Sequence, residues 1–269
     1  MFELINKNGV FLLKSTVLKS NHAFSTRIGG ISELEHTKGM NLAFGRGDSA
    51  ATVLRNLELL ASALGINPAD VISVSQIHSN TVVKVTFEDA GRGCYLDSSF
   101  SCDGYVTSEA NLPIGVKTAD CVPILLEARD NDGNVIAVSA IHAGWRGTAD
   151  RIAANAILKL CELGAEKENI YVAIGPCIDK CCYEVGMDFA KAIEEKLGQN
   201  YKNKFVIKGD NGSLYADLKG MNLNVLTDLG VPRENINVSE YCACCNENLF
   251  YSHRRQKGVR GAHLSVIVK

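Results

Sequence analysis

The sequence has few of the features that direct a chain to a polyanion or into a membrane. Its 28 basic and 30 acidic side chains leave no surplus of positive charge for nucleic acid or an anionic lipid surface. The apolar run near the N-terminus, Val10 to Leu13, is broken by Lys14 and is too short for a signal-peptide core or a bilayer span. We therefore expect a cytoplasmic protein with neither nucleic-acid nor membrane partners.

Proline is also scarce, and the few prolines do not gather at a boundary. Five prolines stand singly among 269 residues, and no Pro/Ser-rich linker, repeat or low-complexity tract divides the chain. With a hydrophobic content of 46%, the chain can bury a substantial core. We predict one domain over residues 1–269.

Short apolar and alternating segments predict a chain rich in β-strands. Strands are expected at residues 71–78, 81–86, 103–107, 113–118, 122–128, 135–142, 170–175, 236–242 and 263–269. In the stretch from Thr81 to His142 the strands follow one another through short turns. This favours antiparallel pairing, because no helical crossover intervenes.

Helices are expected on either side of this block, over residues 49–65, 148–164, 188–198 and 217–230. Ser49 is a candidate N-cap for the first helix, and Gly65 ends it. Runs of strands flanked by helices are typical of an α+β fold, in which helices cover a mostly antiparallel core.

Histidine is scarce as well, with six in the chain, but two of them stand at the ends of predicted strands. His78 in "SQIHSNT" and His142 in "IHAGWRGT" occupy such positions, and Cys121 in "KTADCVP" occupies a third. Two imidazoles and one thiolate can bind zinc or copper, and three protein ligands leave a fourth position open, as in catalytic zinc sites. Such an ion would lower the pKa of a bound water to about 7.

The same residues allow two other interpretations. Each could be an ordinary hydrogen-bonded histidine or a buried thiol. Alternatively, Cys121 could be a nucleophile, with His78 or His142 as its base and Asp103 or Asp120 orienting that base, as in a cysteine hydrolase. These residue types and spacings leave the choice between metal ligand and nucleophile open.

The segment "HAGWRGT" also suggests an anion site. Gly144 and Gly147 lie between a predicted strand and a helix that begins near Thr148, where free backbone N–H groups can bind an anion. Arg146 lies between them and has a guanidinium suited to phosphate. A tight turn with a surface arginine explains the segment equally well. We expect Trp145 to pack in the core.

The ten cysteines include two clusters, "CIDKCC" (Cys177, Cys181, Cys182) and "CACC" (Cys242, Cys244, Cys245). In a reducing compartment they suggest a metal, catalysis or buried thiols rather than disulfides. The clusters do not form the two C-x₂-C pairs typical of a structural zinc site. We therefore favour buried reduced thiols over a second metal or a redox pair.

Several motifs together resemble the YfiH family, whose members are described both as laccase-domain, multicopper polyphenol oxidase-like proteins and as purine nucleoside phosphorylases. The motifs are "TRIGGIS", "NLAFGRGD", "QIHSN", "CDGYVT", "PIGVKTADCVPILL", "AIHAGWRGT", "AIGPCIDKCCYEVG" and "YSHRRQKGVRG". The resemblance implies a single α+β domain with a layered α-β-β-α core. It also implies a metal site made by His78, Cys121 and His142. The implied activities are phosphorolysis of adenosine, inosine, guanosine or methylthioadenosine, adenosine deamination, and a link to peptidoglycan editing.

A four-copper laccase needs more histidines than the six available, so the histidines support one metal at most. We expect a zinc-dependent enzyme, with copper as the alternative ion, acting on purine nucleosides and phosphate. Cys121 and Arg146 are the expected catalytic residues, and Arg146, Arg27, Asn41 and Gln76 the expected substrate contacts. The alternatives are a cysteine-nucleophile amide hydrolase or peptidoglycan-precursor editing enzyme, a single-copper polyphenol oxidase, and a non-enzymatic purine-binding protein.

Overall fold

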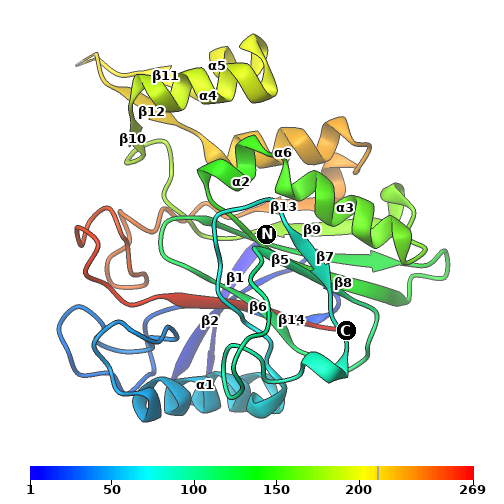
Figure 1. The fold of residues 1–269 in the computed structure, drawn as a ribbon, viewed down its shortest axis with the longest axis vertical. Coiled ribbons are helices and arrows are strands. Elements are labelled where there is room, and N and C mark those ends of the chain that lie inside the picture. The colour runs from blue at the N-terminus through cyan, green and yellow to red at the C-terminus, as the bar shows by residue number, and fades with distance from the viewer. Residues whose placement is uncertain (211) are drawn as a thin grey trace.

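Two β-sheets packed face to face form the centre of the molecule in the computed structural model, which describes residues 1–210 and 212–269 (Figure 1). The first sheet has the order β1-β2-β3-β14-β6, formed by β1 (Phe2–Lys7), β2 (Val10–Ser15), β3 (Asn21–Ser25), β14 (His263–Val268) and β6 (Ile114–Thr118). The second has the order β13-β9-β7-β8-β5-β4, formed by β13 (Ile236–Val238), β9 (Ile170–Ile174), β7 (Val122–Arg129), β8 (Val135–Ala143), β5 (Gly104–Thr107) and β4 (Val82–Lys84).

Helices cover the outer faces of both sheets (Figure 1). The five-stranded sheet carries α1 (Ala50–Leu64), and the six-stranded sheet carries α2 (Trp145–Ala149), α3 (Ile152–Glu162) and α6 (Leu218–Asp228). Farther out lie α4 (Met187–Leu197), α5 (Gln199–Phe205) and a small sheet of β10 (Glu184–Val185), β12 (Leu214–Ala216) and β11 (Val206–Lys208). Short 3₁₀ turns occur at Pro68–Asp70, Phe87–Asp89, Lys167–Asn169 and Arg233–Asn235. The predicted α+β fold with α-β-β-α layers is confirmed.

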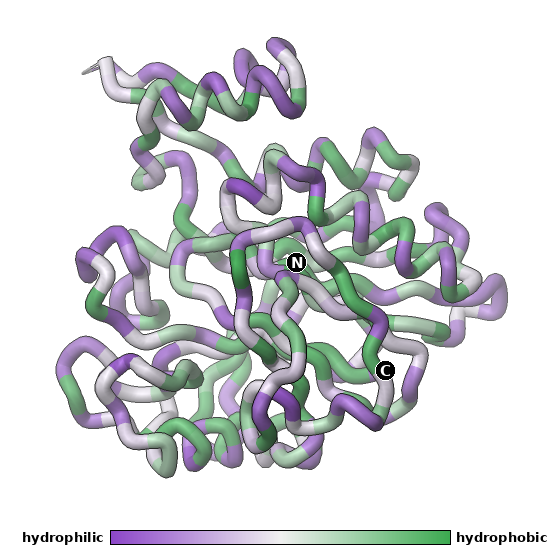
Figure 2. The backbone as a smooth tube through the Cα atoms, viewed as in Figure 1, coloured by the Kyte–Doolittle hydropathy of each residue, from purple (hydrophilic) through white to green (hydrophobic). Residues whose placement is uncertain are grey.

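Three apolar clusters fill the spaces between the four layers. Along β7 the side chains alternate, so that Ile124 and Leu126 face the helices while Leu125 faces the other sheet. Leu57 and Leu60 of α1 pack on the far side of the five-stranded sheet. Figure 2 shows the resulting pattern, with hydrophobic residues concentrated in the central strands and hydrophilic residues frequent in the outer loops.

Helix α1 begins and ends as the sequence predicts. The Ser49 side chain accepts a hydrogen bond from the backbone N–H of Thr52 at 3.1 Å, and Gly65 ends the helix in the left-handed conformation with a φ of 67°. The predicted helix over residues 148–164 instead becomes two helices. The first helix already starts at Trp145. The helical conformation is interrupted at Arg151, which has a φ of 57°.

The predicted strand at 71–78 is wrong. This segment makes only isolated bridges at Ile72 and Ser75, because Gln76 pairs through its side chain instead of its backbone. The Gln76 amide accepts from the Lys117 backbone N–H at 2.7 Å and donates to the Lys117 carbonyl at 2.8 Å. The sequence also missed β1, β2 and β3. Antiparallel pairing holds for β5, β7 and β8, but β4 pairs with β5 in parallel, as β13 does with β9.

The chain segments that carry the candidate functional residues lie at one edge of the six-stranded sheet, the edge formed by the ends of its strands. His142 on β8 lies opposite Pro123 on β7, and Ile174 on β9 lies opposite Ile124 on β7 and beside Val238 on β13. The starts of β5 and β7 therefore lie at the same edge as the ends of β8, β9 and β13. Among the helices of the described residues, none is long and apolar enough to cross a membrane.

Glu127 on β7 provides a test of how the two sheets are joined. Its buried carboxylate accepts backbone N–H groups of Lys19 at 3.0 Å and Ser20 at 2.7 Å and the Arg129 Nε–H at 2.6 Å. Glu127→Ala leaves these donors unpaired inside the protein and should lower the free energy of unfolding by about 3–5 kcal/mol in urea denaturation. Glu162→Ala, which removes an exposed ion pair on α3, should change it little. Equal effects would contradict this account.

Candidate metal centre

Three side chains from separate segments converge at this sheet edge. His78 lies in the loop before β4, Cys121 immediately precedes β7, and His142 lies near the end of β8. One ligand atom from each residue lies within 4.8 Å of the others. The two imidazole rings meet edge to face, with ring centroids 4.9 Å apart. The arrangement is a His-Cys-His group that can hold a metal ion, with ligand types that suit zinc or copper.

The carboxylate of Asp103, at the start of β5, holds two of these ligands in place. Its Oδ1 lies 2.8 Å from His142 Nδ1 and accepts the backbone N–H of His78 at 3.0 Å. Its Oδ2 accepts the backbone N–H groups of Ile77 at 3.2 Å and Ser79 at 2.7 Å, and the Ser79 hydroxyl at 2.8 Å. With Nδ1 bonded to the carboxylate, His142 keeps Nε2 free for a metal, as metal-bound histidines usually do.

Burial and mutual contacts together set the pKa values of Asp103, Cys121 and His142. Burial of Asp103 opposes its ionisation, but hydrogen bonds from His142 and Ser79 lower its pKa to about 2. Burial likewise opposes ionisation of Cys121, yet the two histidines lower the pKa of its thiol to about 6. Desolvation disfavours the imidazolium of His142, but Cys121 and Asp103 raise its pKa to about 9. The site is therefore built to hold a thiolate at neutral pH.

Gly144 allows the three ligands to approach one another. A Cβ atom at this position would meet His78 Cδ2 at 3.0 Å, Cys121 Sγ at 3.4 Å and His142 Cε1 at 3.5 Å. A Cβ on Gly147 would meet the Ser79 carbonyl at 2.8 Å. The glycines of "HAGWRG" thus have a packing role around the ligands.

A pocket of about 320 Å³ opens beside the three ligands. This volume lies at the lower end of the range of about 300–1,000 Å³ found for small-molecule sites. Its other lining residues include an aromatic ring, an amide and three cations: Phe44, Gln76, Arg46, Lys117 and Arg260. The Lys117 ammonium already donates to the Ser73 carbonyl at 2.7 Å, whereas the buried Nε of Arg260 has no partner among the described residues.

The other residues expected to contact substrate lie in different surroundings. Of these, Gln76 lines the pocket. Asn41 is fully buried, where it donates to the Ala43 carbonyl and to Asp48. Arg27 donates to backbone carbonyls of Lys38 and Glu247 and lies over the Tyr251 ring. Arg146 is exposed on α2 with its guanidinium 4.4 Å from the Trp145 ring centroid. Trp145 itself is partly buried and packs against the core.

The remaining four histidines lie outside this group. His22 bonds to Ser15 and Ser20, and His263 accepts the backbone N–H of Tyr251, so both are structural. His36 bonds to the Arg46 carbonyl, and His253 is exposed. No second group of histidines forms in the part of the chain that the structure describes. The histidines of the described residues therefore suit one metal ion at most, rather than the several of a multicopper enzyme.

The fold and the site together indicate a layered α+β protein whose His-Cys-His group can hold one metal ion. Residues 21–269 match the family described as multi-copper polyphenol oxidoreductase laccase, and the chain belongs to this family. It is 36% identical over 237 residues to adenosine deaminase RL5 from an unknown prokaryotic organism, covering 87% of this chain and 88% of that protein. It is 32% identical over 252 residues to purine nucleoside phosphorylase YlmD of Bacillus subtilis strain 168, covering 91% and 86%.

Solved structures agree with this assignment. A Bacillus licheniformis hypothetical protein, YfiH, superposes with a TM-score of 0.89 at 30% identity, covering 99% of this chain and 98% of that one. YlmD of Geobacillus stearothermophilus superposes with a TM-score of 0.87 at 30% identity, covering 100% and 98%. The resemblance to the YfiH family is confirmed.

Asp103→Asn tests the orienting role of this carboxylate. The amide is nearly the same size, but it removes the charge beside His142 and cannot accept through both of its atoms. Metal affinity, measured by competition with a chromophoric chelator, should fall about 10–100-fold. The exposed Asp132→Asn is a matched control and should leave affinity unchanged. Unaltered affinity in Asp103→Asn would show that the carboxylate does not position the ligands.

The lowered pKa of Cys121 predicts the pH dependence of its alkylation in metal-free protein. Since the thiolate is the reactive form, the iodoacetamide reaction should be slow below pH 6, rise through about pH 6 and reach a plateau near neutrality. Peptide mass spectrometry follows this one cysteine among the ten. An inflection near pH 9 would mean that His78 and His142 do not stabilise the thiolate.

Proposed function

We propose that the protein is a metal-dependent enzyme of purine nucleosides, cleaving their glycosidic bond with phosphate and deaminating adenosine. The main support is the position of the His-Cys-His group, which lies in the wall of a pocket that also holds an aromatic ring and three cationic side chains. Relatives named adenosine deaminase and purine nucleoside phosphorylase support this choice of substrate.

His78, Cys121 and His142 suit a zinc ion, with copper as the alternative. The donor set is one thiolate and two imidazoles, His142 is oriented by Asp103, and Gly144 lacks the Cβ that would crowd the ligands. A zinc ion held there would supply a Lewis acid beside the pocket that these residues line.

Arg260 and Arg46 are the side chains best placed to bind phosphate. Both line the pocket, and the Arg260 Nε–H is buried without a partner among the described residues, although a buried donor normally has one. Burial and, less strongly, the proximity of Arg46 lower the pKa of Arg260. Both effects destabilise the guanidinium cation, so an anion bound beside it would stabilise it. Arg146 lies outside the lining of this pocket, so its assignment to phosphate stays a prediction.

The remaining lining residues suit a nucleoside. Phe44 is 38% exposed and offers a ring face on which a purine can stack, and Gln76 is fixed by its two bonds to Lys117. In phosphorolysis a phosphate oxygen would bond to C1′ of the ribose as the C1′–N9 bond breaks. The electron pair would leave with the purine, which takes up a proton. Arg260 and Arg46 would hold the attacking phosphate and Phe44 the departing base.

A cysteine hydrolase is the second candidate, because Cys121, His142 and Asp103 are also arranged like the nucleophile, base and carboxylate of a catalytic triad. His142 lies between the thiol and the carboxylate, which bonds to its Nδ1 at 2.8 Å. His78 has no role in a triad but completes a three-ligand metal site. Its place beside Cys121 favours the metal-dependent enzyme.

Incubation with adenosine and phosphate, followed by chromatography, tests the proposal. Inosine reports deamination, whereas adenine with ribose 1-phosphate reports phosphorolysis and should require phosphate. Cys121→Ala should abolish both activities and release the metal. Activity that persists in metal-free wild-type protein, and is then lost on alkylation of Cys121, would support the hydrolase instead.

Arg260→Ala tests the phosphate site. Loss of one charged hydrogen-bond donor, worth about 1.5–3 kcal/mol, should raise the KM for phosphate roughly 10–150-fold with a smaller effect on the KM for adenosine. Arg55→Ala, on the exposed face of α1, is the matched control. A large effect in Arg146→Ala and none in Arg260→Ala would return the phosphate site to Arg146.

A further inference from the structure

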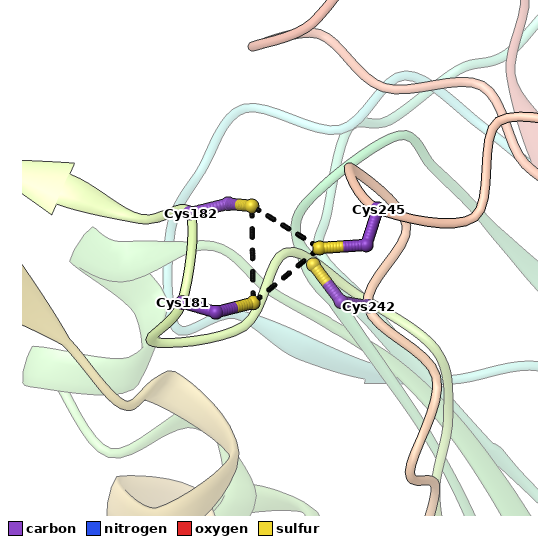
Figure 3. A group of neighbouring side chains, drawn as sticks. All are labelled: Cys181, Cys182, Cys242 and Cys245. Carbon is purple, nitrogen blue, oxygen red and sulfur yellow. Dashed lines mark hydrogen bonds between the residues drawn. The ribbon is translucent and has the colours of Figure 1, made fainter.

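Four of the ten cysteines form a second group, distinct from the His-Cys-His site. The side chains of Cys181, Cys182, Cys242 and Cys245 point toward one another from two facing loops (Figure 3). The Sγ atoms of Cys181 and Cys182 are 3.8 Å apart, and those atoms lie 3.6 Å and 3.3 Å from Cys245 Sγ. All four sulfur atoms lie within 4.8 Å of one another.

These distances suit four thiolates around one ion. Zinc binds cysteine sulfur at about 2.3 Å, so the edges of a regular ZnS₄ tetrahedron measure about 3.8 Å. The three sulfur–sulfur distances among Cys181, Cys182 and Cys245 are close to this value. A disulfide, by contrast, joins two sulfurs at about 2.05 Å and gives no reason for four to converge.

The fold brings the two cysteine loops to the same place. Strands β9 and β13 are parallel neighbours, so the loops that follow them leave the sheet at one edge. Cys177 and Cys242 continue the pairing as an isolated bridge, and the Ala243 N–H donates to the Cys177 carbonyl at 2.7 Å. Cys242 and Cys245 form a C-x₂-C pair within "CACC", and the vicinal Cys181 and Cys182 face them.

The surroundings supply donors and positive charge for a tetrathiolate. The Asp179 backbone N–H donates to Cys242 Sγ at 3.4 Å. Arg254 donates to the Cys182 carbonyl at 3.3 Å, and Arg255 donates to the Cys244 carbonyl at 2.7 Å. The buried Lys219 ammonium donates to Asp179 at 3.0 Å and to backbone carbonyls of the second loop. Since Lys219 is paired with Asp179, the positive charge beside the two loops comes from Arg254 and Arg255, which suits a zinc ion with four thiolates and its two negative charges.

We propose that Cys181, Cys182, Cys242 and Cys245 form a structural zinc site, separate from the His-Cys-His centre and independent of the proposed function. Four protein ligands leave no open position, so the ion crosslinks the loop after β9 to the loop after β13. The first loop also supports the active centre, because the Ile178 N–H donates to the carbonyl of Asp120, the residue before Cys121, at 3.0 Å.

Metal analysis of protein purified under reducing conditions without added metal tests this proposal. Wild-type protein should contain two metal equivalents per chain, of which the four-cysteine group holds one as zinc. Cys121→Ala should keep that zinc, and Cys182→Ser with Cys245→Ser should lose it. Cys161→Ser, a half-buried cysteine outside both groups, is the matched control and should keep two.

Cobalt replacement identifies the ligands without depending on those serine variants. In Cys121→Ala stripped of metal, one equivalent of Co²⁺ should produce the sulfur-to-metal charge-transfer bands of a tetrahedral tetrathiolate and protect four thiols from alkylation. Three results would overturn the proposal: no metal in Cys121→Ala, iron in place of zinc, or disulfides between the two loops detected by mass spectrometry.

Discussion

The carboxylate of Asp103 is the group on which the candidate centre depends. It accepts three successive backbone N–H groups, from Ile77 to Ser79, and the contact of its Oδ1 with Nδ1 fixes the His142 ring. His78 has a φ of 59°, in the left-handed region that few side chains favour, and these bonds offset the cost of that conformation. One buried side chain therefore sets the backbone of one ligand and the ring orientation of another.

The same sheet edge explains why two cysteine-containing groups lie close together. Asp120 and Cys121 stand at the start of β7, next to the end of β9 in the sheet. Asp120 has a φ of 89°, and its side chain accepts the Arg254 backbone N–H at 2.6 Å. Arg254 also bonds to the Cys182 carbonyl. The four-cysteine group and the His-Cys-His group are thus joined through short hydrogen-bonded connections, and the loop that carries Cys182 helps to hold Cys121.

The sequence predicted those features that depend on local chemistry. The cap and stop of α1 follow from Ser49 and Gly65, and the convergence of His78, Cys121 and His142 follows from polar residues at strand ends. It failed at 71–78, where alternation suggested a strand but the Gln76 side chain replaces the backbone partner. It placed the start of a helix at Thr148, although α2 begins at Trp145 and the helical conformation is interrupted at Arg151.

Contacts across long stretches of chain were beyond the sequence patterns. The cysteine clusters lie far apart in the sequence, with a separation of 63 residues between Cys182 and Cys245, and they meet because β9 and β13 pair in parallel. The C-x₂-C spacing of Cys242 and Cys245 can be seen in the sequence, but their proximity to Cys181 and Cys182 cannot. The position of Arg260 in the pocket also depends on a long-range contact, because the strand that follows it, β14, inserts between β3 and β6.

Diffraction from crystals on both sides of the zinc absorption edge shows directly whether the His-Cys-His group binds zinc. We expect an anomalous peak bound by ring nitrogens of His78 and His142 at about 2.0–2.1 Å and by Cys121 Sγ at about 2.3 Å. Asp103 should remain bonded to Nδ1 of His142. Zinc-replete crystals with no peak at this position, and with Cys121 bonded only to histidine, would contradict this expectation.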